Sequence, residues 1–94
     1  MLVRLVKLTF RSEEIAQFLV NFELHKAKLL NFKGCQFVEL LRSNDDESVF
    51  FTHSHWDDEK ALERYRKSEL FNAIWSKTKP MFREKAEAWS LQAP

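Results

Sequence analysis

The residues best suited to chemistry lie together near the middle of the chain, between Thr52 and Trp56. His53 and His55 are two positions apart, so in a strand both side chains point to one face, whereas Thr52 and Trp56 point to the other. An imidazole titrates near neutral pH, and either histidine could therefore act as a general base. We take His53 and His55 as the candidate proton acceptors.

A metal site and a cysteine nucleophile are both poorly supported. A metal needs at least three well-placed protein ligands, and only His25 or Glu39 could join the histidine pair. Cys35 is the only cysteine, and no third group is evident that would orient an imidazole beside it. We expect no metal, and we interpret Cys35 as a small buried residue.

Two further aromatic residues, Tyr65 and Trp75, fall on the apolar stripe of a predicted helical region. Together with Thr52 and Trp56 they offer two indole N–H groups, a hydroxyl and a phenol, which could orient a flat aromatic substrate. We take these four residues as the candidate substrate-binding set. None of them is a good base near neutral pH, and the three aromatic ones could instead be packed core residues.

The elements that would position these residues follow from hydrophobic periodicity and capping signals. Ser12 and Ser68 are expected to cap helices. The pattern predicts strands at 1–10, 35–42, 48–56 and 85–92, a helix from Ser12 to about Leu30, and two helical segments after Asp57 that meet near Ser68. This β-α-β-β-α-β order predicts a ferredoxin-like α+β fold, with an antiparallel sheet and two helical segments on one face.

The chain has 94 residues, so we expect a single domain spanning 1–94. In such a fold one face of the sheet is bare in a monomer. The strands at 1–10 and 35–42 are apolar at both odd and even positions, which is typical of strands buried on both sides. We therefore expect a homodimer joined through the sheet face.

Charge and cysteine content limit the partners and the compartment. The 15 basic and 14 acidic residues are interspersed, which argues against nucleic-acid binding. No apolar run approaches the roughly 20 residues that a membrane helix needs, so we expect no membrane partner. One cysteine and the lack of a recognisable signal peptide fit a cytoplasmic protein.

The chain resembles the antibiotic biosynthesis monooxygenase family of the dimeric α+β barrel superfamily. The segments that carry the resemblance are 34–41, 50–56, 61–65, 68–71 with Trp75, and 88–90. The resemblance implies a dimer whose two sheets pack into a barrel, with a pocket between each sheet and its own helices. It also implies one of two activities, because some members oxygenate electron-rich phenols or quinols without a cofactor and others degrade haem.

The residues favour the first activity. Similar haem-degrading members carry Asn, Trp and His at positions that correspond to Val6, Tyr65 and Trp75, so we expect no haem cofactor. Similar oxygenases share Trp56 but place an amide where this chain has Thr52. The leading hypothesis is a cofactor-independent monooxygenase acting on a small electron-rich aromatic substrate. A non-catalytic dimeric ligand-binding or regulatory protein is the alternative, and the sequence leaves open whether the chain is an enzyme.

Overall fold

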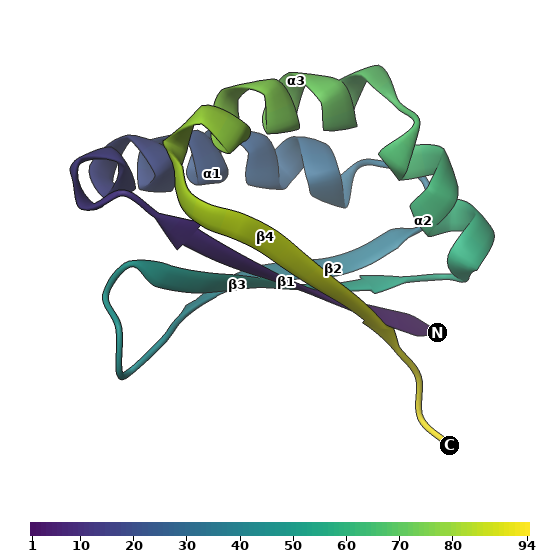
Figure 1. Ribbon diagram of the computed structural model, residues 1–94. Helices are drawn as coiled ribbons and strands as arrows, with labels where there is room; N and C mark the ends of the chain where they lie inside the picture. The colour runs from purple at the N-terminus through teal and green to yellow at the C-terminus, as the bar shows by residue number, and fades with distance from the viewer.

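Four strands and three helices make up the computed structural model, which describes residues 1–94 (Figure 1). The strands form one antiparallel sheet in the order β2-β3-β1-β4, which confirms the predicted ferredoxin-like α+β fold. The elements are β1 (Leu2–Phe10), α1 (Ile15–Leu30), β2 (Cys35–Arg42), β3 (Val49–Trp56), α2 (Glu59–Arg66), α3 (Glu69–Thr78) and β4 (Phe82–Leu91). Short 3-10 turns at Ser12–Glu14 and Lys79–Met81 precede α1 and β4.

Both helices that follow β3 begin at a side-chain cap. The Asp58 carboxylate accepts the Ala61 backbone N–H at 2.8 Å, which begins α2. The Ser68 hydroxyl accepts the Phe71 N–H at 3.1 Å, which begins α3. Such side-chain acceptors satisfy backbone donors that a helix start leaves free. The predicted break at Ser68 is confirmed, and it allows α2 and α3 to lie over different parts of the sheet.

Two boundary predictions were wrong. Ser12 does not cap α1, because the chain leaves β1 through a 3-10 turn whose Glu14 N–H bonds the Arg11 carbonyl at 3.0 Å. The last strand begins at Phe82, three residues before the predicted start at position 85. Phe82 pairs with Phe10 of β1 and packs against its ring at 5.4 Å between centroids. The charged residues that follow Phe82 interrupt the hydrophobic pattern, so the pattern did not indicate the first three residues of the strand.

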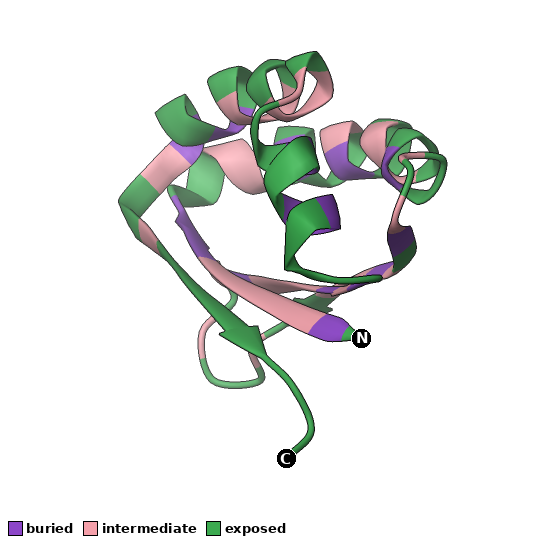
Figure 2. Ribbon diagram, turned by 90° about the vertical axis from the view of Figure 1, so that its right-hand side faces the viewer, coloured by how far each residue is buried: buried purple, intermediate pink, exposed green.

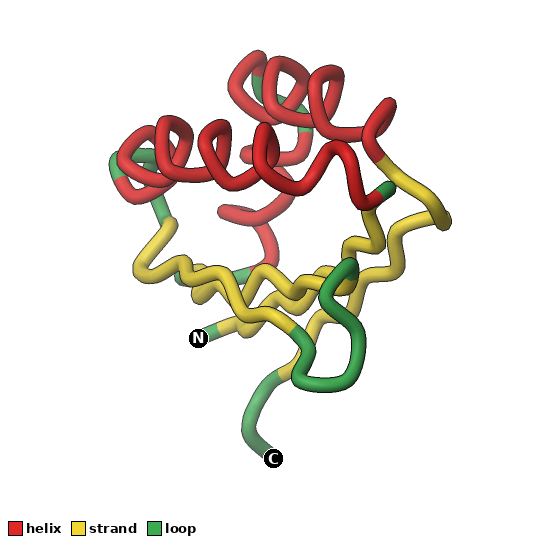
Figure 3. Tube along the Cα trace, turned by 90° about the vertical axis from the view of Figure 1, so that its left-hand side faces the viewer, coloured by secondary structure: helices red, strands yellow, loops and turns green.

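A cluster of aromatic rings lies at one end of the space between sheet and helices. Phe10 is fully buried, and its ring lies 4.1 Å from Phe18 of α1 and 5.8 Å from Phe50 of β3, measured between centroids. All helices lie on one side of the sheet, as the view along its edge shows (Figure 3). Buried segments gather between these two layers (Figure 2). This aromatic packing therefore fixes the distance between α1 and the sheet.

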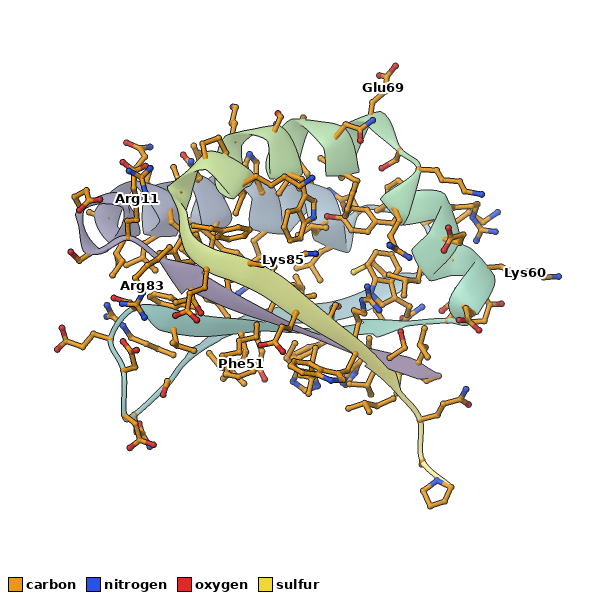
Figure 4. All side chains as sticks on the ribbon, viewed as in Figure 1. Arg11, Phe51, Lys60, Glu69, Arg83 and Lys85 are labelled. Atoms are coloured by element: carbon orange, nitrogen blue, oxygen red, sulfur yellow. The ribbon has the colours of Figure 1, made fainter.

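The other face of the sheet carries no helix (Figure 1). Phe51 points away from the helices on this outer face (Figure 4). Strand pairing places eight apolar side chains there: Val3, Leu5, Phe37, Leu41, Val49, Phe51, Trp89 and Leu91. Leu41, Trp89 and Leu91 are 46%, 42% and 45% exposed. Exposed apolar side chains on an uncovered sheet face make it a candidate contact surface.

Candidate functional site

A cavity of about 670 Å³ lies between the inner face of the sheet and the three helices. Because strand side chains alternate, β1 contributes Arg4 and Val6 to it, and β3 contributes Thr52, Ser54 and Trp56. All three helices add both apolar and polar side chains to the lining. All four residues predicted to bind substrate line this one cavity: Thr52, Trp56, Tyr65 and Trp75. That they contact a substrate stays a prediction.

Trp56 forms a wall of the cavity. It is only 2% exposed, and its ring stacks on Tyr65 with 5.0 Å between centroids. The indole N–H of Trp56 donates to the Ser54 hydroxyl at 3.0 Å. This donor is therefore already used within the protein, and the hydroxyl proton of Ser54 is the donor that this pair can turn toward a ligand.

The polar groups of the other three predicted residues line the cavity without a hydrogen bond in the chain. They are the Thr52 hydroxyl, the Tyr65 hydroxyl and the Trp75 indole N–H. Burial, followed by the nearby Cys35, raises the pKa of the Tyr65 phenol. The phenol therefore stays protonated at neutral pH and can donate a hydrogen bond. Convergent donors in an apolar cavity are typical of a ligand site.

The raised pKa of Tyr65 predicts a loss of stability in alkali. The phenol ionises near pH 10 in the unfolded chain, whereas it stays protonated to higher pH in the folded protein. The free energy of unfolding therefore keeps this contribution below about pH 10. Above that pH it falls by about 1.4 kcal/mol per pH unit. Urea unfolding of the wild type and Tyr65→Phe between pH 8 and about pH 11 measures this. The stability of the wild type should fall relative to that of Tyr65→Phe as the pH rises above about 10, because only the wild type carries the phenol. A constant difference would contradict the burial of a neutral phenol.

The predicted proton acceptors lie elsewhere. His53 and His55 point to the outer face of the sheet, and neither lines the cavity. The pairing of β3 with β1 runs from Val49 to Trp56 without a bulge, so nothing turns them inward. His53 Nδ1 lies 2.9 Å from Glu39 Oε1, and its Nε2 lies 3.0 Å from Nε2 of His55. The structure thus separates both histidines from the four predicted substrate residues.

Cys35 also lacks the partner that a nucleophile needs. It lies opposite Trp56, and Phe37 is the β2 residue opposite His55. Burial raises the pKa of the Cys35 thiol, although a hydrogen bond with the backbone of Phe37 opposes this. The thiol stays protonated at neutral pH and is a buried residue, as the sequence indicated.

One histidine does reach the cavity. His25 of α1 lines it, and burial lowers the pKa of its imidazole, with Lys77 and Lys28 adding to the effect. A neutral imidazole can accept a proton. In the sequence, His25 entered only as a possible third metal ligand. Its spacing from Phe18, Phe22 and Leu29, which are buried on the same helix, could have placed it on the inward stripe.

The topology and the ligand-sized cavity define a small ferredoxin-like α+β protein with an internal site on one face of its sheet. More particularly, the chain belongs to the antibiotic biosynthesis monooxygenase family, whose model matches residues 1–76. The predicted family is thereby confirmed. No curated protein matches the chain. No helix is long and apolar enough to span a membrane.

Solved structures support the fold. A crystal structure of an antibiotic biosynthesis monooxygenase has a TM-score of 0.92 at 19% identity, covering 100% of this chain and 99% of the other. A conserved protein from Methanosarcina mazei Go1 has a TM-score of 0.92 at 17% identity, with coverages of 100% and 94%. A Caulobacter crescentus CB15 protein that carries the same family name has a TM-score of 0.91 at 22% identity, with coverages of 99% and 89%.

Proposed function

We propose that this protein is a cofactor-independent monooxygenase that acts on a small electron-rich aromatic substrate of the phenol or quinol type. The observation that carries the proposal is the open cavity of about 670 Å³, lined by Trp56, Tyr65 and Trp75 with free hydrogen-bond donors among them. Ligand sites of this kind usually measure about 300–1,000 Å³. If these aromatic rings had filled the space, the non-catalytic alternative would be favoured.

The proposed reaction uses the electrons of the substrate itself. A phenol and dioxygen give a quinone and water: one oxygen atom becomes the new carbonyl oxygen, and the other leaves with the two hydrogens that the substrate loses. The protein assists by removing the phenolic proton, because the phenolate gives up electrons more readily. His25 is the neutral base in the cavity, and the Tyr65 hydroxyl is a donor for developing negative charge.

Oxygen uptake in metal-free buffer with a panel of dihydroxynaphthalenes tests this proposal. The wild type should exceed the autoxidation background. At neutral pH, His25→Gln should lower the rate on the order of 100-fold, the usual contribution of a general base. Raising the pH should restore the rate, because the substrate then ionises without help.

His53→Gln is the matched comparison, since it removes a histidine from the outer face instead. Its rate should stay close to that of the wild type. A large loss in His53→Gln with none in His25→Gln would reverse the assignment of the base. A wild type that never exceeds the background would contradict the enzyme and favour the non-catalytic alternative.

We also propose that the protein works as a homodimer joined through the outer face of the sheet. Leu41, Trp89 and Leu91 support this, because three large apolar side chains on one face are more than 40% exposed. An 11.3 kDa chain also buries a modest share of its surface by itself.

A further inference from the structure

The charges around the cavity are all of one sign. Three permanently cationic residues line it, Arg4, Arg66 and Lys79, and no aspartate or glutamate does. The chain as a whole is nearly neutral, with a net charge of +1. The positive lining is therefore a property of the cavity and not of the overall composition.

Arg4 has an unusual environment. It points inward from the central strand β1, where Ser54 of β3 and Ser90 of β4 are its neighbours in register. Its Nη1 donates to the Ser90 hydroxyl at 2.9 Å, and no carboxylate lies within 4.0 Å of its guanidinium. Arg66 differs, because its Nη1 lies 3.6 Å from a carboxylate oxygen of Glu63.

Arg4 is partly buried and has no carboxylate partner. Burial lowers the pKa of Arg4, and the charge of Arg66 lowers it further, while the charge of Glu63 opposes them. Both leading effects mean that the guanidinium is short of compensating negative charge. A bound anion would supply that charge, and the planar guanidinium fits a carboxylate through two parallel hydrogen bonds.

We propose that the ligand of this cavity is an aromatic carboxylate whose carboxylate pairs with Arg4, with Arg66 beside it. The aromatic ring then lies in the apolar part of the cavity, which Trp56, Tyr65 and Trp75 line. The hydroxyl of Ser54, next to Arg4 in the sheet, is a further donor to the anion. This inference rests on the proposed function, since it names the chemical class of the substrate, a phenol that carries a carboxylate.

Binding of two inert probes tests the inference without turnover. The anion 2-naphthoate and the neutral 2-naphthamide have the same ring system and nearly the same shape, and neither is a phenol. Titration calorimetry should show that the wild type binds 2-naphthoate about 10-fold or more tightly than 2-naphthamide. This difference is expected for charge-assisted hydrogen bonds. Arg4→Gln should remove this preference by weakening 2-naphthoate alone. Arg4→Lys should keep part of it, because the charge remains but the two-pronged geometry is lost.

The control is Lys60→Gln. Lys60 of α2 is exposed and points away from the sheet (Figure 4), so its loss removes the same charge without touching the cavity. The preference for 2-naphthoate should survive in this variant. Retained binding of 2-naphthamide shows that Arg4→Gln is folded, and if that variant fails to fold, Arg4→Lys gives the answer.

Three results would overturn the inference: equal affinities of the two probes for the wild type, no binding of either probe, or a preference that survives Arg4→Gln. The same experiments distinguish a failure of this inference from a failure of the proposed function. Preference for 2-naphthoate that depends on Arg4, with no oxygen uptake on any phenol, would leave the anion site standing and remove the enzyme. Oxygen uptake on neutral phenols, with no preference between the two probes, would support the enzyme and contradict the anion site.

Discussion

Leu5→Asp is expected to convert the protein from a dimer of roughly twice 11.3 kDa into a monomer. Leu5 lies on the outer face of the central strand, between His53 of β3 and Trp89 of β4. If two sheets stack through this face, each copy would bury one unpaired carboxylate, at a cost of several kcal/mol. The dissociation constant should rise on the order of 100-fold or more. Light scattering at micromolar concentration measures the mass directly.

Lys60→Asp is the matched control, because it places the same side chain on α2, away from the sheet. This variant should keep the mass of the wild type. Circular dichroism should show the same secondary structure in both variants, since neither residue packs in the core between sheet and helices. A wild type that is itself monomeric would contradict the proposed dimer.

Gly34→Ala is expected to lower the free energy of unfolding by about 3 kcal/mol, from overpacking and backbone strain together. Gly34 has a φ of 95°, in the left-handed region that side chains with a Cβ rarely adopt. A Cβ at this position would overlap the Cβ of Ala61, which is fully buried in α2. The Gly34 carbonyl also accepts the Asp57 N–H at 2.9 Å, so a shift here disturbs the link from β3 to α2. Urea unfolding of the wild type and Gly34→Ala measures this change in the free energy of unfolding.

A double-mutant cycle separates the two causes. Ala61→Gly alone should cost about 1 kcal/mol, because glycine is a poor helix former. The variant that carries both substitutions relieves the overlap but not the backbone strain. It should be less destabilised than the sum of the two single variants by about 1 kcal/mol or more. Strict additivity would show that the overlap with Ala61 is not the cause.

The alternation of strand side chains carried much of the sequence prediction. It correctly separated Thr52 and Trp56 from the histidines, and helical spacing added Tyr65 and Trp75 to the same cavity. These residues could be grouped because each one follows the simple period of its own strand or helix.

The rest of the site could not be predicted in this way. Arg4 looked like a polar interruption of an apolar strand, since its place in the cavity depends on which face the helices cover. Helical spacing could have placed His25 on the inward stripe of its helix, but the lowered pKa of its imidazole comes from burial and from Lys77 on another helix. Both properties arise between elements, where a local pattern carries no information.

The alternation along β1 makes two traits of the protein separately adjustable. Its even-numbered residues Arg4 and Val6 line the cavity, and its odd-numbered residues Val3 and Leu5 lie on the outer face of the sheet. A laboratory evolution experiment that randomises positions 4 and 6 would change the cavity lining and leave the outer face unaltered, whereas randomising positions 3 and 5 would change the proposed dimer surface alone. A single strand in this fold thus offers an engineer two independent libraries within four adjacent codons.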